Sequence, residues 1–238
     1  MQLSCTDLAD SPSKTRAASL QLGAQRGGYG GPRVQTSGGL GVPIDIAIRG
    51  ATVVAQRDIV VAGVGIDRGL ITSVGSDVPW GRREIDARGM VVLPGGIDPH
   101  VHLSNESDRR TAQSDYGDDF ATGSRAAAAG GITTFGCMIP SRAGEQLANS
   151  VLRAERFACG TSLIDFFRHP EVELPTEQTV GGLRRLWTLG YPSVKMYMML
   201  GDFEPRLGAY IRIMNTASES GVVVLIHCEW GRLLDQFA

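Results

Sequence analysis

The chain has no apolar run that approaches the roughly 18–20 residues needed to cross a bilayer. The first 30 residues also lack the continuous apolar segment of a secretory signal. There is no excess of one charge, because 23 Lys and Arg residues are nearly balanced by 25 Asp and Glu residues. A net charge of −2 gives no electrostatic basis for binding nucleic acid or an anionic membrane. We therefore expect a cytoplasmic protein with neither of these as a partner.

Cysteine is scarce, and its four copies have no CxxC spacing. This pattern is typical of reduced thiols in a cytosolic protein. The segment after residue 43 also lacks the GxGxxG and P-loop glycine spacings that bind phosphates, which argues against a nucleotide-binding protein. With 42% hydrophobic and 20% charged residues, the composition is that of an ordinary globular protein.

Three segments differ in character. Residues 1–43 contain a dense run of glycine mixed with Ser, Gln and Arg but show no hydrophobic periodicity, so we predict a disordered Gly-rich tail. Residues 44–92 contain short strands separated by turn signals, beginning with the alternation of Ile44, Ile46 and Ile48. They predict a small antiparallel β domain, a β-sandwich portion.

Residues 93–238 alternate between strands and helices. Helical faces are predicted on Leu147, Val151, Ala154 and Ala158, and again on Val180, Leu183 and Trp187. The apolar run 222–226 predicts a strand buried on both faces. Five consecutive βα units predict a parallel sheet, which can belong either to an open doubly wound sheet or to a TIM barrel.

Polar residues occur at the ends of these strands. His100 and His102 lie two apart near the end of the first strand, so both imidazoles point to the same side. His227 ends the fifth strand and His169 the third, which accounts for all four histidines. A lone core histidine would be the simpler interpretation of each, but their shared position at strand ends favours a common site.

Lys195 lies in the middle of the apolar fourth strand. Burying a lysine as a cation is costly, so its pKa should fall and favour the neutral amine. A neutral amine can add carbon dioxide to form a carbamate, whose two oxygens can bridge two metal ions. The alternative is a lysine whose ammonium group reaches solvent at a strand end.

These motifs together resemble the cyclic amidohydrolase group of the amidohydrolase superfamily, which includes dihydropyrimidinases, hydantoinases and allantoinases. The resemblance runs from about Ile44 onward. It rests on five segments in order: Pro94–Leu103, Asp118–Thr134, Ile139–Glu145, Val194–Met198 and His227–Glu229.

The resemblance implies an α/β fold in which the first five βα units form a partial TIM (β/α)8 barrel after the small β domain. It implies two divalent metal ions, expected to be zinc. His100 and His102 would bind one ion and His227 the other, while Lys195, N6-carboxylated, would bridge both as a catalytic residue. The implied reaction is the opening of a dihydropyrimidine or hydantoin ring by attack of a bimetal-bound hydroxide on a ring carbonyl. The partner is a small cyclic amide, and the intact form is expected to be a homo-oligomer, a tetramer.

Two departures from the family pattern affect the expected function. The family has a further metal-binding His after strand six and an Asp after strand eight, and the sequence offers neither, so we expect an N-terminal fragment that is inactive alone. Leu200 stands where hydantoinases carry a substrate-facing Tyr five residues after the lysine. The alternatives are allantoinase-type activity and a non-catalytic dihydropyrimidinase-like scaffold protein, although scaffolds of that kind tend to lose the metal ligands retained here.

Overall fold

The structure is a computed structural model that describes residues 42–55, 58–104, 117–142, 144–200 and 203–236. The predicted Gly-rich tail therefore lies outside the described residues, apart from its last two. The described residues divide into two compact units with the boundary between Pro94 and Gly95. Within these ranges, no helix is long and apolar enough to cross a membrane.

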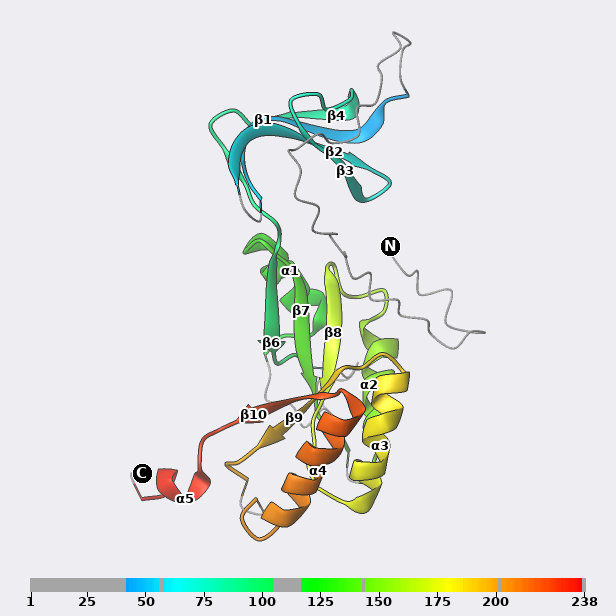
Figure 1. Ribbon diagram of the computed structural model, residues 1–238, viewed down its shortest axis with the longest axis vertical. Coiled ribbons are helices and arrows are strands. Elements are labelled where there is room, and N and C mark those ends of the chain that lie inside the picture. The colour runs from blue at the N-terminus through cyan, green and yellow to red at the C-terminus, as the bar shows by residue number, and fades with distance from the viewer. Residues whose placement is uncertain (1–41, 56–57, 105–116, 143, 201–202, 237–238) are drawn as a thin grey trace. The chain divides into compact units, whose positions relative to one another are not determined.

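The first unit is a single five-stranded sheet. Its strands are β1 (Ile44–Val54), β2 (Ile59–Asp67), β3 (Leu70–Gly75), β4 (Gly81–Asp86) and β5 (Val91–Val92). They lie in the order β3-β2-β1-β4, with β5 also paired to β1 (Figure 1). A small apolar core covers one face and includes the buried side chains of Ala51, Val53, Ala62 and Val64.

The antiparallel arrangement expected for this unit is wrong for two of its pairings. β1 pairs antiparallel with β2, but it pairs parallel with both β4 and β5. β4 and β5 run in the same direction along one edge of β1, so the segment around Gly89 interrupts the strand instead of reversing it. The alternation of Ile44, Ile46 and Ile48 does not continue along β1, because a bulge between Ile48 and Ala51, at Gly50 with φ +72°, changes which residues face the core.

The second unit consists of parallel strands connected by helices. Its elements are β6 (Gly96–Val101), α1 (Phe120–Ala129), β7 (Ile132–Ile139), α2 (Leu147–Ala158), β8 (Asp165–Pro170), α3 (Glu177–Thr188), β9 (Ser193–Tyr197), α4 (Leu207–Ser220), β10 (Val223–His227) and α5 (Gly231–Leu234). β6, β7 and β8 form one parallel sheet, and β9 and β10 form another. A single parallel bridge between Glu171 and Lys195 joins the two. The five βα units predicted from the sequence are therefore present in order.

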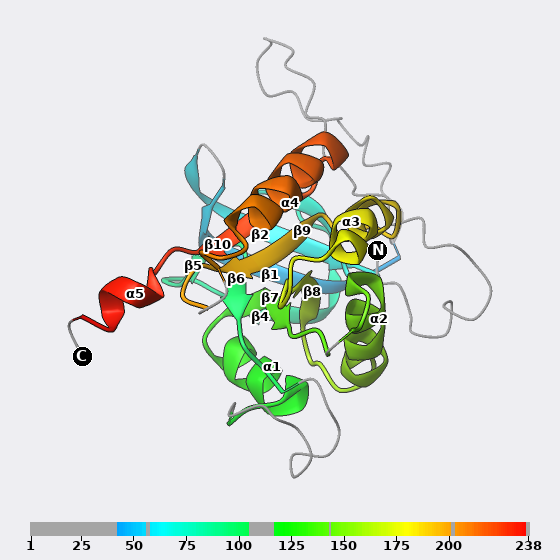
Figure 2. The same cartoon turned by 90° about the horizontal axis from the view of Figure 1, so that it is seen from below.

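Two of the helices begin with a side-chain cap. Asp119 caps α1 by accepting from the backbone N–H of Thr122, whose hydroxyl bonds back to Asp119 N–H. Thr176 and Thr179 form the same capping box at the start of α3. Such caps satisfy N–H groups that have no partner within the helix. Figure 2 shows α1 to α4 around the outer side of the strands of this unit.

The two faces of these strands carry different residues. On β7, Phe135, Cys137 and Ile139 are buried in a core shared with Phe120 of α1 and Ala154 of α2. On β9 and β10, Val194, Met196, Val224 and Ile226 pack in a second core with α3 and α4. Because side chains alternate along a strand, the residues between these positions point to the opposite face, away from the helices. That helix-free face is called the inner face below.

Two expectations about burial are wrong. Trp187 is 52% exposed, and the neighbouring Leu186 takes its place in the core together with Leu183. The strand at 223–227 is not buried on both faces, since Val223 is 61% exposed. Only its helix-facing residues pack in a core, and this leaves the inner face of β10 open for polar residues.

Candidate metal and catalytic site

The imidazoles of His100 and His102 lie together on the inner face. Val101 and Leu103 pack in the core on the side of the helices. His100 and His102 alternate with them along the chain and therefore point to the opposite side. Their Nε2 atoms are 3.2 Å apart and their ring centroids 5.2 Å apart. The two imidazoles that the sequence places two residues apart therefore lie side by side.

Burial favours the neutral form of both imidazoles. Burial lowers the pKa of His100, and the positive charges of Lys195 and His227 act in the same direction, while Asp98 opposes them. Burial likewise lowers the pKa of His102, with His100, Lys195 and His227 adding to the effect. A neutral imidazole has a lone pair available for a metal ion.

Lys195 is buried, with 2% of its surface exposed. Burial lowers the pKa of its ammonium group, although the carboxylate of Glu171 and the thiol of Cys228 favour the charged form. Its Nζ lies 5.2 Å from the centre of the Tyr197 ring. The expected shift toward the neutral amine is therefore present. A sequence signal was overlooked here: of 23 basic residues only two, Lys14 and Lys195, are lysines.

His227 is the last residue of β10 and pairs in register with Tyr197. Its Nε2 is 2.6 Å from Oε2 of Glu229, and its ring lies 5.7 Å from that of Tyr197. Tyr197 in turn donates its hydroxyl to Oε1 of Glu171 at 2.9 Å. The ring of Tyr197 is therefore close to both Lys195 and His227, and its hydroxyl is fixed by the hydrogen bond to Glu171.

Glu171 and Tyr197 were missed by sequence reasoning. Burial raises the pKa of Glu171, and the negative charge of Glu173 acts in the same direction. The Tyr197 hydroxyl and the charge of Lys195 oppose this rise. The one available signal was the spacing of Tyr197, two residues after Lys195 and hence on the same face of the strand. Nothing in the sequence indicated Glu171, because its contact with β9 comes from the bridge between β8 and β9.

The four predicted residues do not form a complete site. Within the described part of the chain, no three His, Cys, Asp or Glu side chains are grouped so as to hold a metal ion. The structure brings His100 and His102 together as a pair and places Lys195 and His227 on the same inner face, with Nε2 of His227 bonded to Glu229. A metal site would need His227 to leave Glu229.

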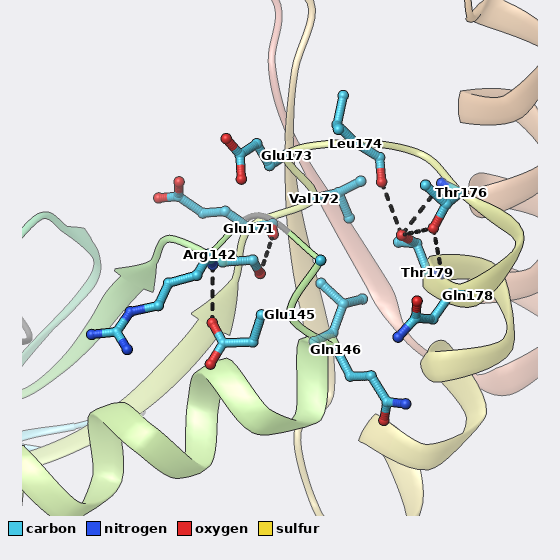
Figure 3. A pocket seen from close by; sticks show the side chains of 13 residues that line it. Arg142, Glu145, Gln146, Glu171, Val172, Glu173, Leu174, Thr176, Gln178 and Thr179 are labelled. Carbon is cyan, nitrogen blue, oxygen red and sulfur yellow. Dashed lines mark hydrogen bonds between the residues drawn. The ribbon is translucent and has the colours of Figure 1, made fainter. Parts of the chain in front are cut away.

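A cavity lies beside this region (Figure 3). It has a volume of about 120 Å³ and is bordered by the loops after β7 and β8 and the first turns of α2 and α3, including Arg142, Glu145 and Glu171. None of the four predicted metal-ligating residues lines it. It is also smaller than the roughly 300–1,000 Å³ of typical small-molecule sites. The candidate site is therefore the inner face of the strands and not this cavity.

Comparison with known proteins agrees with the fold and the motifs. The chain is 34% identical over 198 residues to a D-hydantoinase from Ralstonia pickettii, a match that covers 81% of this chain and 41% of the relative. It is 34% identical over 205 residues to an allantoinase from Rubrobacter xylanophilus, covering 82% of this chain and 42% of the relative. A solved D-hydantoinase structure superposes with a TM-score of 0.72 at 34% identity, over 81% of this chain and 42% of that one. No family model matches the chain.

The mixed α/β fold matches that of a hydantoinase, an amidohydrolase, over part of the chain. Over the matched residues, the chain is homologous to the hydantoinases and allantoinases, which are cyclic amidohydrolases. It spans about 41% of the length of the D-hydantoinases it matches.

Proposed function

We propose that this chain contributes the first part of the active site of a metal-dependent hydrolase that opens cyclic amides of the hydantoin or dihydropyrimidine type. One observation carries the proposal: the 3.2 Å pair of His100 and His102 lies on the same inner face as buried Lys195 and strand-end His227. The five βα units would be the first five of a (β/α)8 barrel. Their consecutive parallel order and the helices along one face support this.

The residues present fit a divalent metal ion. A tetrahedral zinc ion bound to two imidazole nitrogens at about 2.0–2.1 Å holds them about 3.3 Å apart. The Nε2 atoms of His100 and His102 are 3.2 Å apart, and burial lowers the pKa of both rings, which favours the neutral form that binds a metal ion. His100 and His102 would hold one ion, His227 a second, and Lys195 as its carbamate would contact both. Bound ions would supply a nucleophile from water near neutral pH and polarise the amide carbonyl.

Lys195 is suited to become a carbamate. Its neutral amine attacks the carbon of carbon dioxide, one N–H proton passes to water, and the product is an anionic N-carboxylate. Burial lowers the pKa of the amine and so keeps the lone pair that this addition needs. The product is a buried anion, and the positive charge of the bound ions would offset the cost of burying it.

Allantoin is the second substrate candidate. Leu200, 37% exposed, offers no hydroxyl where the hydantoinase pattern expects a Tyr, and the allantoinase relative is as similar as the D-hydantoinase. A non-catalytic scaffold is a third candidate. The close pair of His100 and His102 and the burial of Lys195 argue against a scaffold, because a protein that only supports assembly needs no paired imidazoles and no buried amine on one face.

Metal binding tests the histidine pair. Purified chain, stripped and reloaded with Zn²⁺ or Co²⁺, should bind the ion, and His100→Ala should lose most of it. Arg184→Ala is the control, because Arg184 lies on the outer surface of α3 with 75% of its side chain exposed. Equal metal content in the wild-type chain and His100→Ala would show that His100 is not a ligand.

Carbon dioxide labelling tests the carbamate. Since the chain has only two lysines, a Lys14→Arg variant leaves Lys195 as its single side-chain amine. With ¹³C-bicarbonate and Zn²⁺, that variant should give one carbamate carbon resonance, and the further change Lys195→Arg should remove it. A resonance that survives the second change would come from elsewhere and refute the assignment.

Ring opening is measured on hydantoin, dihydrouracil and allantoin. Because no three acidic, His or Cys side chains of the described residues are grouped to hold an ion, we expect weak metal binding and little or no hydrolysis by these 238 residues alone. Activity should rise when the remaining part of a related hydantoinase is added. Zinc-dependent turnover by the unassisted chain, abolished by His100→Ala, would show that the chain needs no further ligands.

A further inference from the structure

His169 is the one histidine that takes no part in the proposed metal site. It lies in β8 and is 5% exposed. Both of its ring nitrogens have partners on other strands: Nδ1 is 2.5 Å from Oγ of Ser193 in β9, and Nε2 is 3.1 Å from the carbonyl oxygen of Pro99 in β6. One side chain therefore connects three strands.

The partners determine the tautomer of the ring. The carbonyl oxygen of Pro99 can only accept, so Nε2 of His169 carries the proton and donates it. Nδ1 then accepts from the hydroxyl of Ser193. Burial lowers the pKa of His169, although the bond to Pro99 acts against the shift. The ring is thus a neutral linker with a defined direction.

Gly136 provides the space for this link. β7 lies between β6 and β8 in the sheet, so the ring of His169 has to pass over β7 to reach Pro99. A Cβ at Gly136 would lie 2.6 Å from the Pro99 carbonyl oxygen and 2.7 Å from Nε2 of His169. No side chain larger than hydrogen fits there without moving one of the two bonded atoms. The absence of a side chain at Gly136 and the hydrogen bond of His169 are therefore parts of one arrangement.

The link joins the strands that carry the candidate ligands. Pro99 directly precedes His100, and Ser193 lies two residues before Lys195 on the same face of β9. Between β8 and β9 the described backbone offers only the bridge of Glu171 with Lys195, where the two sheets meet. We propose that His169, with the space provided by Gly136, is a positioning residue that sets the location of His100 relative to Lys195. This inference rests on the proposed function for its metal-dependent part.

The first test is made on the unmodified, metal-free chain. Long-range ¹H–¹⁵N correlation spectra distinguish the two neutral tautomers of each histidine. We expect His169 to carry its proton on Nε2, with a slowly exchanging N–H. A proton on Nδ1, or a charged ring at pH 7, would overturn the inference without any substitution having been made.

The second test also needs no metal. Lysine labelled with ¹³C at Cε gives two resonances, and Lys14 serves as the internal reference for Lys195. His169→Ala and Gly136→Ala should move the Lys195 resonance and leave the other in place. His169→Gln should restore the original position, because its amide can donate to Pro99 and accept from Ser193. An unmoved Lys195 resonance in folded His169→Ala would refute the positioning role.

The third test measures Co²⁺ affinity by the visible spectrum. Loss of groups that orient metal ligands lowers metal affinity by about 10–100-fold. We expect such a loss in His169→Ala and Gly136→Ala, a smaller one in Ser193→Ala, and recovery in His169→Gln. Wild-type affinity in both of the first two variants would contradict the proposal. If the wild-type chain binds no Co²⁺ through His100 while the first two tests succeed, the proposed function fails and the positioning role of His169 stands.

Discussion

Replacing Lys195 with methionine separates the effect of its buried charge on the free energy of unfolding from its proposed role in the metal site. Lys195 is 2% exposed, and within the described residues its Nζ makes no hydrogen bond and no ion pair, only an approach of 5.2 Å to the Tyr197 ring. Methionine has nearly the same length and volume but no charge. Lys195→Met therefore fills the same space on the inner face while removing the buried ammonium group.

The expected change in stability follows from two opposing terms. A volume-conserving replacement in a packed site costs less than about 1.5 kcal/mol. Replacing buried charged groups by well-packed apolar side chains of similar volume is neutral or stabilises a protein by roughly 1–4 kcal/mol. Because burial lowers the pKa of Lys195, part of that penalty is already relieved by loss of the proton. We expect metal-free Lys195→Met to be between unchanged and about 2 kcal/mol more stable than the wild-type chain at pH 7.

The difference should depend on pH in one direction. The folded-state pKa of Lys195 lies below its ordinary value, so between the two values the unfolded chain binds more protons than the folded chain. Wild-type stability then rises with pH in that interval. The destabilisation is complete below the folded pKa and disappears as the pH approaches the unfolded value of about 10.4. The advantage of Lys195→Met should therefore shrink from pH 7 to pH 10.

Urea unfolding in EDTA at pH 7, 8.5 and 10 measures this difference, with Lys14→Met as the control for loss of a lysine elsewhere. Lys195→Met should form no carbamate and should not bind Co²⁺ at the second metal site, which is the site proposed for His227. A Lys195→Met chain that is more than about 2 kcal/mol less stable at pH 7 would refute the reasoning, because the ammonium group would then be a net contributor to the fold.

Three further outcomes are expected. Asp119→Ala should destabilise the chain by about 1 kcal/mol in urea unfolding, because α1 loses its N-terminal cap. Arg153→Met should destabilise by roughly 1–2 kcal/mol at pH 7 through loss of its 2.9 Å ion pair with Glu145. Burial alone would raise the pKa of Glu145, but the hydrogen bonds from Arg153 and the Arg142 N–H lower it below its ordinary value. The stabilisation by this ion pair is therefore complete above the pKa of Glu145 in the unfolded chain and is lost as the pH falls through its pKa in the folded chain. A destabilisation by Arg153→Met that grows in acid would contradict this. Burial raises the pKa of the Cys137 thiol to about 12, so iodoacetamide at pH 8 should modify exposed Cys228 and leave Cys137 untouched until the chain is unfolded.

Local patterns in the sequence were sufficient for most of the second unit. The caps at Asp119 and Thr176 and the buried face of α2 follow from rules that act within a few residues. The pairing of His100 with His102 follows from the strand period alone. These features need no knowledge of what lies across the sheet.

Features that depend on pairing between distant strands were not predictable. The parallel pairing of β4 with β1 depends on the path of the chain between them, and the bulge at Gly50 changes the alternation that Ile44 to Ile48 indicates. Trp187 and Leu186 differ by about 100° around the helix, and the sequence of α3 alone does not decide which of them packs in the core formed with α2 and α4. The role of Gly136 is visible only once Pro99 and His169 are placed on either side of it.

The burial of one of only two lysines gives the chain a natural protease reporter. A lysine-specific endoprotease needs several residues in an extended, accessible form, and around Lys195 these residues pair with β10 and lie against α3 and α4. Cleavage after Lys195 therefore requires β9 to leave its sheet, so its rate follows the population of that open state when reclosing is fast. A ligand that binds across the inner face should slow this single cut, and gel electrophoresis can detect occupancy of the site without any assay of ring opening.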